Sequence, residues 1–129
     1  MKHTLLFLLL ICASSLQITV AGNRPKLTDD ELMTLVQKQT FRYFWDFAHP
    51  ESGLARERSN DRLEVATIGG SGFGVMAIIV GVERGFITRE QGAERLLKIV
   101  EFLNKADSYH GIWAHWMDGA TGKTIPFSR

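Results

Sequence analysis

The chain has 129 residues, which is enough for one domain at most. Hydrophobic residues make up 45% and charged residues 22%, a composition typical of a globular protein and far from that of a disordered one. The 15 basic and 14 acidic residues nearly cancel, so no basic field exists to attract a nucleic-acid backbone. We therefore expect no nucleic-acid partner.

Residues 1–22 are predicted to be an export signal. A short basic start precedes the uninterrupted apolar run 5–11, which is well short of the roughly 20 apolar residues that a membrane span needs. Small residues at Ala21 and Gly22 suit cleavage by signal peptidase. We therefore expect residues 23–129 to form the mature part of a periplasmic or secreted protein.

Cys12 is the only cysteine of the chain. Lipid attachment at Cys12 is the less favoured alternative for export, because Ile11 stands where a small residue is expected before a lipidated cysteine. If the ordinary signal is removed, the mature chain carries no thiol, which excludes redox chemistry and cysteine-ligated zinc.

The first helix is predicted from Thr28 to about Ala48. Thr28 and Glu31 have the spacing of a capping box, in which each residue bonds the backbone N–H of the other. Pro50 disfavours the helical conformation at His49, so the helix is expected to end before it. Apolar residues follow the cap at helical spacing on one face: Leu32, Leu35, Val36, Tyr43, Phe44 and Phe47.

Residues 49–63 are predicted to be a polar loop, and residues 67–83 a second, glycine-rich helix. The apolar content of that segment is nearly continuous, so a buried helix competes with a buried strand, and its length favours the helix. Each glycine costs a helix about 1 kcal/mol relative to alanine. We expect the glycines to allow a neighbouring helix or a ligand to approach the backbone closely, and Gly85 to stop the helix.

A third helix is predicted from Thr88 to about Ala106, again opened by a capping box, here with Gln91. The tail 107–129 is expected to be a long loop or an irregular hairpin. The fold class is therefore all-α. Because the second helix is apolar almost all round, two neighbouring helices are too few to cover it, and the fold is expected to be incomplete.

Two glycine motifs imitate nucleotide-binding sequences. A dinucleotide fingerprint that uses Gly70 and Gly72 needs a third glycine where Val75 stands, and no strand is predicted before it. The segment 122–124 resembles the end of a P-loop, but Met117 stands where its first glycine is required. We expect no nucleotide partner.

The histidines and carboxylates assign neither a metal site nor a catalytic pair. His49, His110 and His115 match no zinc spacing, and we expect no metal or other cofactor. Glycoside hydrolysis needs two carboxyl groups that face each other across a bound sugar, and nothing in the pattern fixes such a pair. Trp113 and Trp116 either stack on a sugar or pack over the helices, and the residues alone favour neither alternative.

Five motifs, in this order, resemble the glucoamylase-like family, which includes bacterial endo-β-1,2-glucanases. The resemblance covers residues 32–129. The motifs are Phe41-Arg42-Tyr43-Phe44-Trp45-Asp46-Phe47, Gly53-Leu54-Ala55-Arg56-Glu57-Arg58, Ser71-Gly72-Phe73-Gly74, Val82-Glu83-Arg84-Gly85 and Gly111-Ile112-Trp113-Ala114-His115-Trp116.

The resemblance implies an (α/α)6 toroid of six outer and six inner helices, of which residues 23–129 are the N-terminal part. It also implies inverting hydrolysis. The family's candidate catalytic carboxylates follow the segment that corresponds to residues 125–128, so no catalytic residue is assigned in this chain. The resemblance implies sugar contacts at Arg58, His115, Trp116 and Asp118. The alternative is that Arg58 pairs with a loop carboxylate and Trp116 belongs to the core.

The function predicted from the sequence is therefore a fragment of an exported glycoside hydrolase that acts on a glucan, of the β-1,2 type. Its expected partners are an oligosaccharide or polysaccharide substrate and the C-terminal part of its own domain. This chain alone is expected to be inactive. The alternative functions are a non-catalytic carbohydrate-binding module and a helical interaction module.

Overall fold

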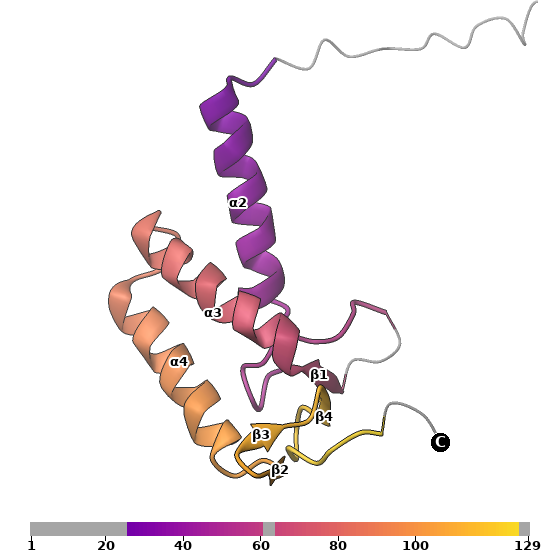
Figure 1. The fold of residues 1–129 in the computed structure, drawn as a ribbon. Coiled ribbons are helices and arrows are strands. Elements are labelled where there is room, and N and C mark those ends of the chain that lie inside the picture. Colours follow the sequence, from indigo (N-terminus) through magenta and orange to yellow (C-terminus); the bar gives the residue numbers. More distant parts are fainter. Residues whose placement is uncertain (1–25, 61–63, 127–129) are drawn as a thin grey trace, which may run out of the picture.

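The computed structural model describes residues 26–60 and 64–126. Three helices dominate, α2 (Asp29–Trp45), α3 (Ile68–Glu83) and α4 (Arg89–Leu103) (Figure 1). Helix α3 crosses the lower half of α2, and α4 lies along the other side of α3. No helix within the described ranges is long and apolar enough to cross a membrane. The predicted export signal, the Cys12 alternative included, lies outside the described residues.

Both predicted capping boxes are confirmed. The Thr28 hydroxyl accepts a hydrogen bond from the backbone N–H of Glu31 at 3.3 Å, and the Glu31 carboxylate accepts the N–H of Thr28 at 2.8 Å. Thr88 and Gln91 make the same two bonds, at 3.2 and 2.9 Å. Helices α2 and α4 end at Trp45 and Leu103, each three residues before the predicted end. The backbone leaves the helical path there and continues into the loops that follow.

The glycines of α3 allow the close helix packing that the sequence predicts. A Cβ on Gly81 would lie 2.4 Å from the Phe41 ring of α2, and a Cβ on Gly74 would lie 3.1 Å from the ring of Phe44. The Phe41 ring is 5% exposed and stacks on Trp45. Helix α2 therefore rests with aromatic rings directly on the backbone of α3.

Two short antiparallel strand pairs complete the fold at the lower end of α3 and α4 (Figure 1). Strand β1 (Val65–Thr67) pairs with β4 (Trp116–Asp118), and β2 (Ser108–Tyr109) pairs with β3 (Ile112–Trp113). The second pair confirms the irregular hairpin predicted for the tail. The first pair corrects the expectation that no strand precedes the glycine-rich helix. Strand β1 has only three residues and no clear alternation, so the sequence does not predict it, and its pairing with β4 defines it as a strand.

The core joins both strands of the first pair to two helices and to the loop 49–60. Residues 49–63 were predicted as a polar loop, but the first part of this loop is buried, with His49, Ser52 and Leu54 enclosed in the protein. The loop folds back on itself through the backbone bond from the His49 N–H to the Leu54 carbonyl, 2.8 Å long. The central cluster consists of Leu54, Ala66, Ile78, Ile99 and Met117.

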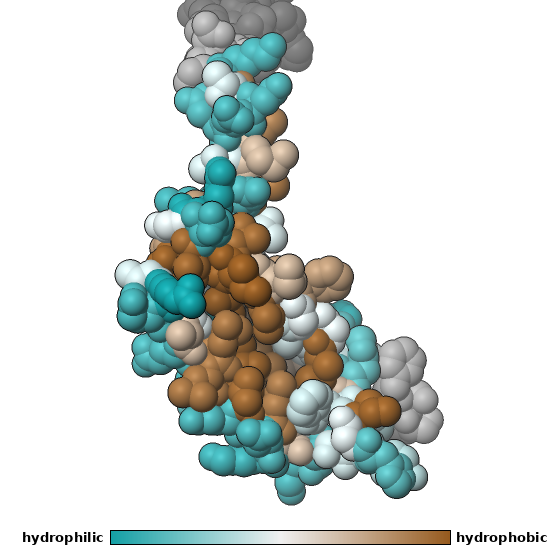
Figure 2. All heavy atoms as spheres, turned by 60° about the vertical axis from the view of Figure 1, so that its left-hand side comes forward, coloured by the Kyte–Doolittle hydropathy of each residue, from teal (hydrophilic) through white to brown (hydrophobic). Residues whose placement is uncertain are grey.

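A broad apolar area remains exposed on this chain. Figure 2 shows apolar side chains gathered below the projecting half of α2. On α3 the side chains of Phe73, Met76 and Ile79 are 72%, 58% and 51% exposed. Monomeric proteins seldom leave contiguous apolar surface of this kind open to water. The expectation that two helices are too few to cover α3 is confirmed by these exposures.

Gly81→Ala is predicted to destabilise the fold by about 1–3 kcal/mol, because the new methyl group would overlap the buried Phe41 ring. The matched control is Gly72→Ala in the same helix, where a Cβ meets nothing within 4 Å. That control is predicted to gain about 1 kcal/mol from helix propensity. Urea unfolding of both variants measures the two effects, and a neutral or stabilising Gly81→Ala would contradict the packing described here.

Candidate functional site

The predicted sugar-contacting residues lie on or beside a small four-segment sheet. Strands β1 and β4 form its centre, with Ala66 opposite Met117. On the outer side of β1, residues 55–57 add an extended segment through bonds from Thr67 N–H to Ala55 and from Glu57 N–H to Val65, 3.0 and 2.8 Å long. On the outer side of β4, residues 123–125 add another.

The register of this sheet assigns each residue to a face. Side chains alternate along a strand, and directly paired residues point to the same side. Ala66 and Met117, both fully buried, form the face that packs into the core. Thr67 and its partner Trp116 therefore lie on the opposite face, where Trp116 is half-buried.

His115 contacts the first turn of α3, and Trp116 pairs with Thr67 just before it. The His115 carbonyl accepts a hydrogen bond from the Ile68 N–H at 3.1 Å, which supplies the helix with a backbone partner where the Thr67 side chain provides no cap. A Cβ on Gly69 would lie 3.9 Å from the exposed His115 ring. The His115 and Trp116 ring centroids are 5.7 Å apart. An imidazole and an indole thus stand together beside a glycine-lined helix start.

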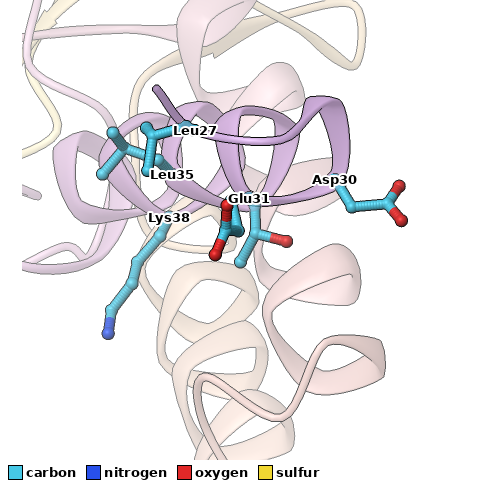
Figure 3. Close-up of a pocket in the computed structure, with 6 residues that line it drawn as sticks. Leu27, Asp30, Glu31, Leu35 and Lys38 are labelled. Atoms are coloured by element: carbon cyan, nitrogen blue, oxygen red, sulfur yellow. The ribbon is translucent and has the colours of Figure 1, made fainter. Parts of the chain in front are cut away.

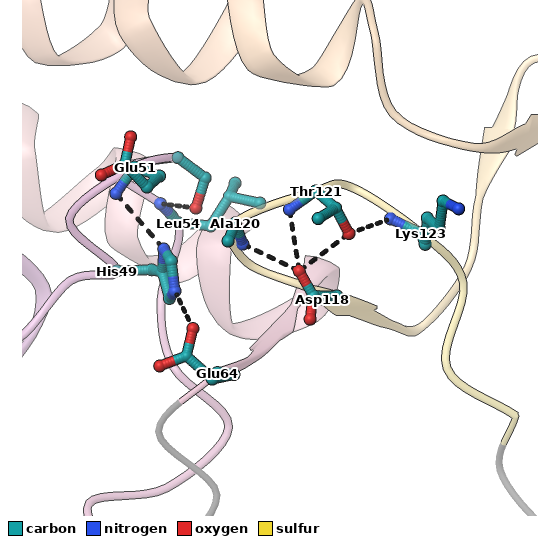
Figure 4. A network of polar contacts seen from close by, with 9 residues as sticks. His49, Glu51, Leu54, Glu64, Asp118, Ala120, Thr121 and Lys123 are labelled. Carbon is teal, nitrogen blue, oxygen red and sulfur yellow. Dashed lines mark hydrogen bonds and ion pairs between the residues drawn. The ribbon is translucent and has the colours of Figure 1, made fainter.

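Asp118 closes a tight turn at the end of β4 (Figure 4). Its Oδ1 accepts hydrogen bonds from the Ala120 N–H at 3.1 Å and from both the N–H and the hydroxyl of Thr121, each at 2.8 Å. The bonds from the Thr121 side chain and backbone, followed by the Ala120 bond, hold the pKa of Asp118 below its usual range. The carboxylate is therefore fixed as an anion in a defined orientation.

Arg58 directly follows the outer segment 55–57 of the same sheet. It forms an ion pair with Glu57, whose N–H bonds to β1 at Val65. Because Val65 in turn faces Asp118, Glu57 stands two strand spacings from Asp118, roughly 10 Å. The pairing of Arg58 with a loop carboxylate is the arrangement that the sequence analysis gave as the alternative to a sugar contact.

Aromatic side chains of α2 and of the turn that follows it anchor this outer segment. The Tyr43 hydroxyl donates a hydrogen bond to the Arg56 carbonyl at 3.0 Å, and the Arg56 guanidinium lies over the Phe47 ring at 4.8 Å. Burial raises the pKa of Tyr43, the charge of Glu57 raises it further, and Arg56 opposes both. The neutral phenol therefore holds the segment against α2 across the physiological pH range.

His49 is the polar residue of this region whose role sequence reasoning missed. Its ring is 2% exposed and lies between Glu64 and the backbone of Glu51 (Figure 4). The sequence analysis used it only to end the first helix and placed it among three histidines that match no zinc spacing. Among residues 26–60 and 64–126, no three His, Cys, Asp or Glu side chains gather in a way that could hold a metal ion. His49 is buried because the loop folds back on itself, and no local sequence pattern predicts that folding.

Two hollows on the surface of the described residues lie away from the sheet. One follows the projecting half of α2 between Leu27 and Lys38 (Figure 3). Its walls come from one helix and Leu27 alone, so a ligand there would remain open to water on its other side. Another is the apolar groove between α2 and α3, lined by Phe44, Phe73 and their neighbours.

Known proteins resemble this chain over most of its length, although no family model matches it. An exo β-1,2-glucooligosaccharide sophorohydrolase (non-reducing end) from Parabacteroides distasonis is 52% identical over 109 residues. A crystal structure from Bacteroides uniformis, provisionally assigned as a glucoamylase, is 82% identical with a TM-score of 0.78, and covers 81% of this chain. This chain is a homologue of glucoamylase-like proteins.

A second solved glucoamylase-like homologue is the endo-β-1,2-glucanase of Chitinophaga pinensis in complex with sophorotriose and glucose. It is 54% identical, covers 81% of this chain and has a TM-score of 0.77. The match spans only 26% and 27% of the two solved chains and 15% of the Parabacteroides protein. The predicted fold, the helical beginning of an incomplete (α/α)6 toroid, is confirmed at the level of a helical unit that matches a small part of these enzymes.

Asp118→Ala is predicted to cost about 1 kcal/mol of stability at pH 7, because the turn loses three hydrogen bonds to Oδ1. Asp118→Asn is the matched control, since its amide oxygen can accept the same bonds. The pKa of Asp118 is lowered on folding, so its stabilising effect is present above the ordinary Asp pKa of about 3.9 and is lost as the pH falls through the lowered value.

Thermal melts of the three proteins between pH 7 and pH 2 measure both effects. The native protein should lose its advantage over Asp118→Ala in acid, whereas Asp118→Asn should show no acid loss from this position. Equal destabilisation by alanine and asparagine at pH 7 would contradict the role of Asp118 in the turn.

Proposed function

We propose that this chain is the N-terminal part of the catalytic domain of an exported glycoside hydrolase that cleaves β-1,2-linked glucan with inversion. The single observation that carries the proposal is 52–54% identity to two proteins named for β-1,2-glucan chemistry. The basic start, the apolar run 5–11 and the small residues before residue 23 support export to the periplasm or beyond.

The contribution of this part of the domain is to bind sugar. The indole of Trp116 offers an apolar face to the C–H surface of a glucose ring, and the His115 imidazole beside it can exchange hydrogen bonds with hydroxyl groups. All the hydrogen bonds to Asp118 described above reach Oδ1, so Oδ2 is the oxygen available to a sugar hydroxyl. Arg58 is proposed to add a cationic donor from the outer segment.

The catalytic acid and base are proposed to come from other parts of the domain. A general acid needs a pKa raised toward neutrality, and the pKa of Asp118 is shifted the opposite way. Glu57 forms an ion pair with Arg58, and Glu64 contacts His49. The carboxylates of Asp118, Glu57 and Glu64 are thus already bonded to neighbouring groups, which supports a division between sugar binding here and bond cleavage elsewhere.

The exposed apolar area is proposed to be the contact with the rest of the same domain. Phe73, Met76 and Val80 line the groove between α2 and α3 and are open to water in this chain. The side chains of a helix form ridges that pack into grooves of this kind on neighbouring helices. The expected occupant is therefore a further helix of the toroid, whose burial of these side chains would release the water that now covers them.

The full-length gene product is predicted to release short β-1,2-glucooligosaccharides from β-1,2-glucan, and residues 23–129 alone to release none. Chromatography of the products measures both, and nuclear magnetic resonance of the first-formed reducing end reports inversion. Hydrolysis by residues 23–129 alone would place the catalytic carboxylates within this chain. Binding without hydrolysis by the full-length protein would favour the non-catalytic carbohydrate-binding module.

Trp116→Ala is predicted to weaken the binding of sophorotriose to the full-length protein about tenfold, the loss expected for one aromatic stacking contact. Trp113→Ala is the matched control. The Trp113 indole N–H donates to the Leu103 carbonyl at 3.0 Å, which directs that ring toward α4. Isothermal titration calorimetry of both variants should show the loss only for Trp116, and equal losses would argue against a sugar contact specific to that residue.

A further inference from the structure

We propose that His49 is a positioning residue for the sugar-contacting strand β4. Its ring connects the loop 49–55, the residue that precedes β1 and the residue that follows β4. The inference rests on the proposed function, because the sugar contacts proposed above lie on β4 and next to it. The effect of the ring on the position of β4 can also be measured without a sugar, by hydrogen–deuterium exchange of residues 114–121.

The hydrogen bonds of the His49 ring define its tautomer. Nδ1 lies 3.3 Å from the backbone nitrogen of Glu51, and this N–H can only donate, so Nδ1 is the acceptor. Nε2 therefore carries the proton and donates to the Glu64 carboxylate at 3.1 Å. The first bond stays within the loop, whereas the second crosses to a different segment. The two ring nitrogens thus have separable tasks.

Gly119 closes the connection to β4. A Cβ at this position would lie 2.5 Å from Cδ2 and 2.6 Å from Cγ of His49, so the ring packs directly on the Gly119 backbone. The Gly119 N–H donates to the Glu64 carbonyl at 2.7 Å. Glu64 is therefore bonded to the ring through its side chain and to Gly119 through its backbone. The three residues fix the position of the chain immediately after Asp118.

A role in packing alone does not account for these contacts. An apolar side chain would fill the same buried space without any need for partners, whereas a buried polar ring requires both nitrogens to be bonded. Both ring nitrogens are bonded here, so the ring fills the buried space and is also fixed in one orientation relative to Glu51 and Glu64. The Glu64 side chain is 69% exposed, so its contact with His49 is an addition at the surface and its removal leaves no cavity.

The test separates the two nitrogens by substitution in the full-length gene product. His49→Gln places an amide N–H near the position of Nε2 and keeps the link to Glu64. His49→Asn places a carbonyl oxygen near the position of Nδ1 and keeps only the bond within the loop. Glu64→Ala removes the link from the other side. Glu51→Ala is the matched control, because Glu51 contacts the ring through its backbone.

Two readouts are measured, hydrogen–deuterium exchange of the peptide 114–121 and the affinity for sophorotriose. We expect His49→Asn and Glu64→Ala to speed exchange at 114–121 and to weaken sophorotriose binding about tenfold, the loss of one charge-assisted bond. His49→Gln and Glu51→Ala are expected to stay within about twofold of the native protein in both readouts.

The proposal is overturned if His49→Asn and Glu64→Ala lower the melting temperature but leave exchange at 114–121 and affinity unchanged, since His49 then acts only as a general stabiliser. It is also overturned if the Gln and Asn variants behave alike. If the native protein fails to bind sophorotriose, the proposed function fails, and exchange at 114–121 still decides whether His49 positions β4.

Discussion

The pairing of β1 with β4 is the interaction on which the rest of the structure depends. Three residue pairs join a segment that leads into α3 to a segment that follows α4. Ala66 and Met117 turn inward from these strands and complete a core with Ile78 and Ile99 of the two helices. Without the pairing, the helices would keep their contacts with one another but lose the core at their lower end.

The same pairing gathers the candidate site. Its outer face carries Trp116, its flanks carry Arg58 and His115, and its end carries the Asp118 turn. Few of these side chains would lie near each other in an isolated bundle of three helices. The helices thus form the scaffold, and the small sheet positions the candidate side chains, which agrees with the common division between a scaffold and the loops that it positions.

The helices could be predicted from the sequence because their signals are local. Each capping box lies within four consecutive residues, and the apolar spacing of α2 and α4 is regular. Strand β1 could not be predicted, because three residues carry too little pattern and their partner is distant in sequence. His49 was likewise read as part of a polar loop, since only the fold shows that Leu54 and Gly119 enclose it.

The candidate site was predicted as residues but not as an arrangement. His115 and Trp116 were singled out by residue type and by family resemblance, and they lie together in the structure. The hydrogen bonds of Asp118 could not be foreseen, because they depend on the turn after β4, and the ion pair of Arg58 was given only as an alternative to a sugar contact. The sequence pattern indicates which side chains belong to the candidate site. Which atoms of those side chains are hydrogen-bonded within the protein depends on the backbone geometry.

The uncapped start of α3 has a consequence for the order of folding during synthesis. Helices α2 and α4 carry their own caps, so the bonds that open each helix form between residues three apart in the chain. The first N–H of α3 instead waits for the carbonyl of His115, which is translated after both α3 and α4. Contacts between distant segments form late because of their chain entropy. The start of the glycine-rich helix and the pairing of β4 are therefore completed late and together, after the segment that carries His115 has been synthesised.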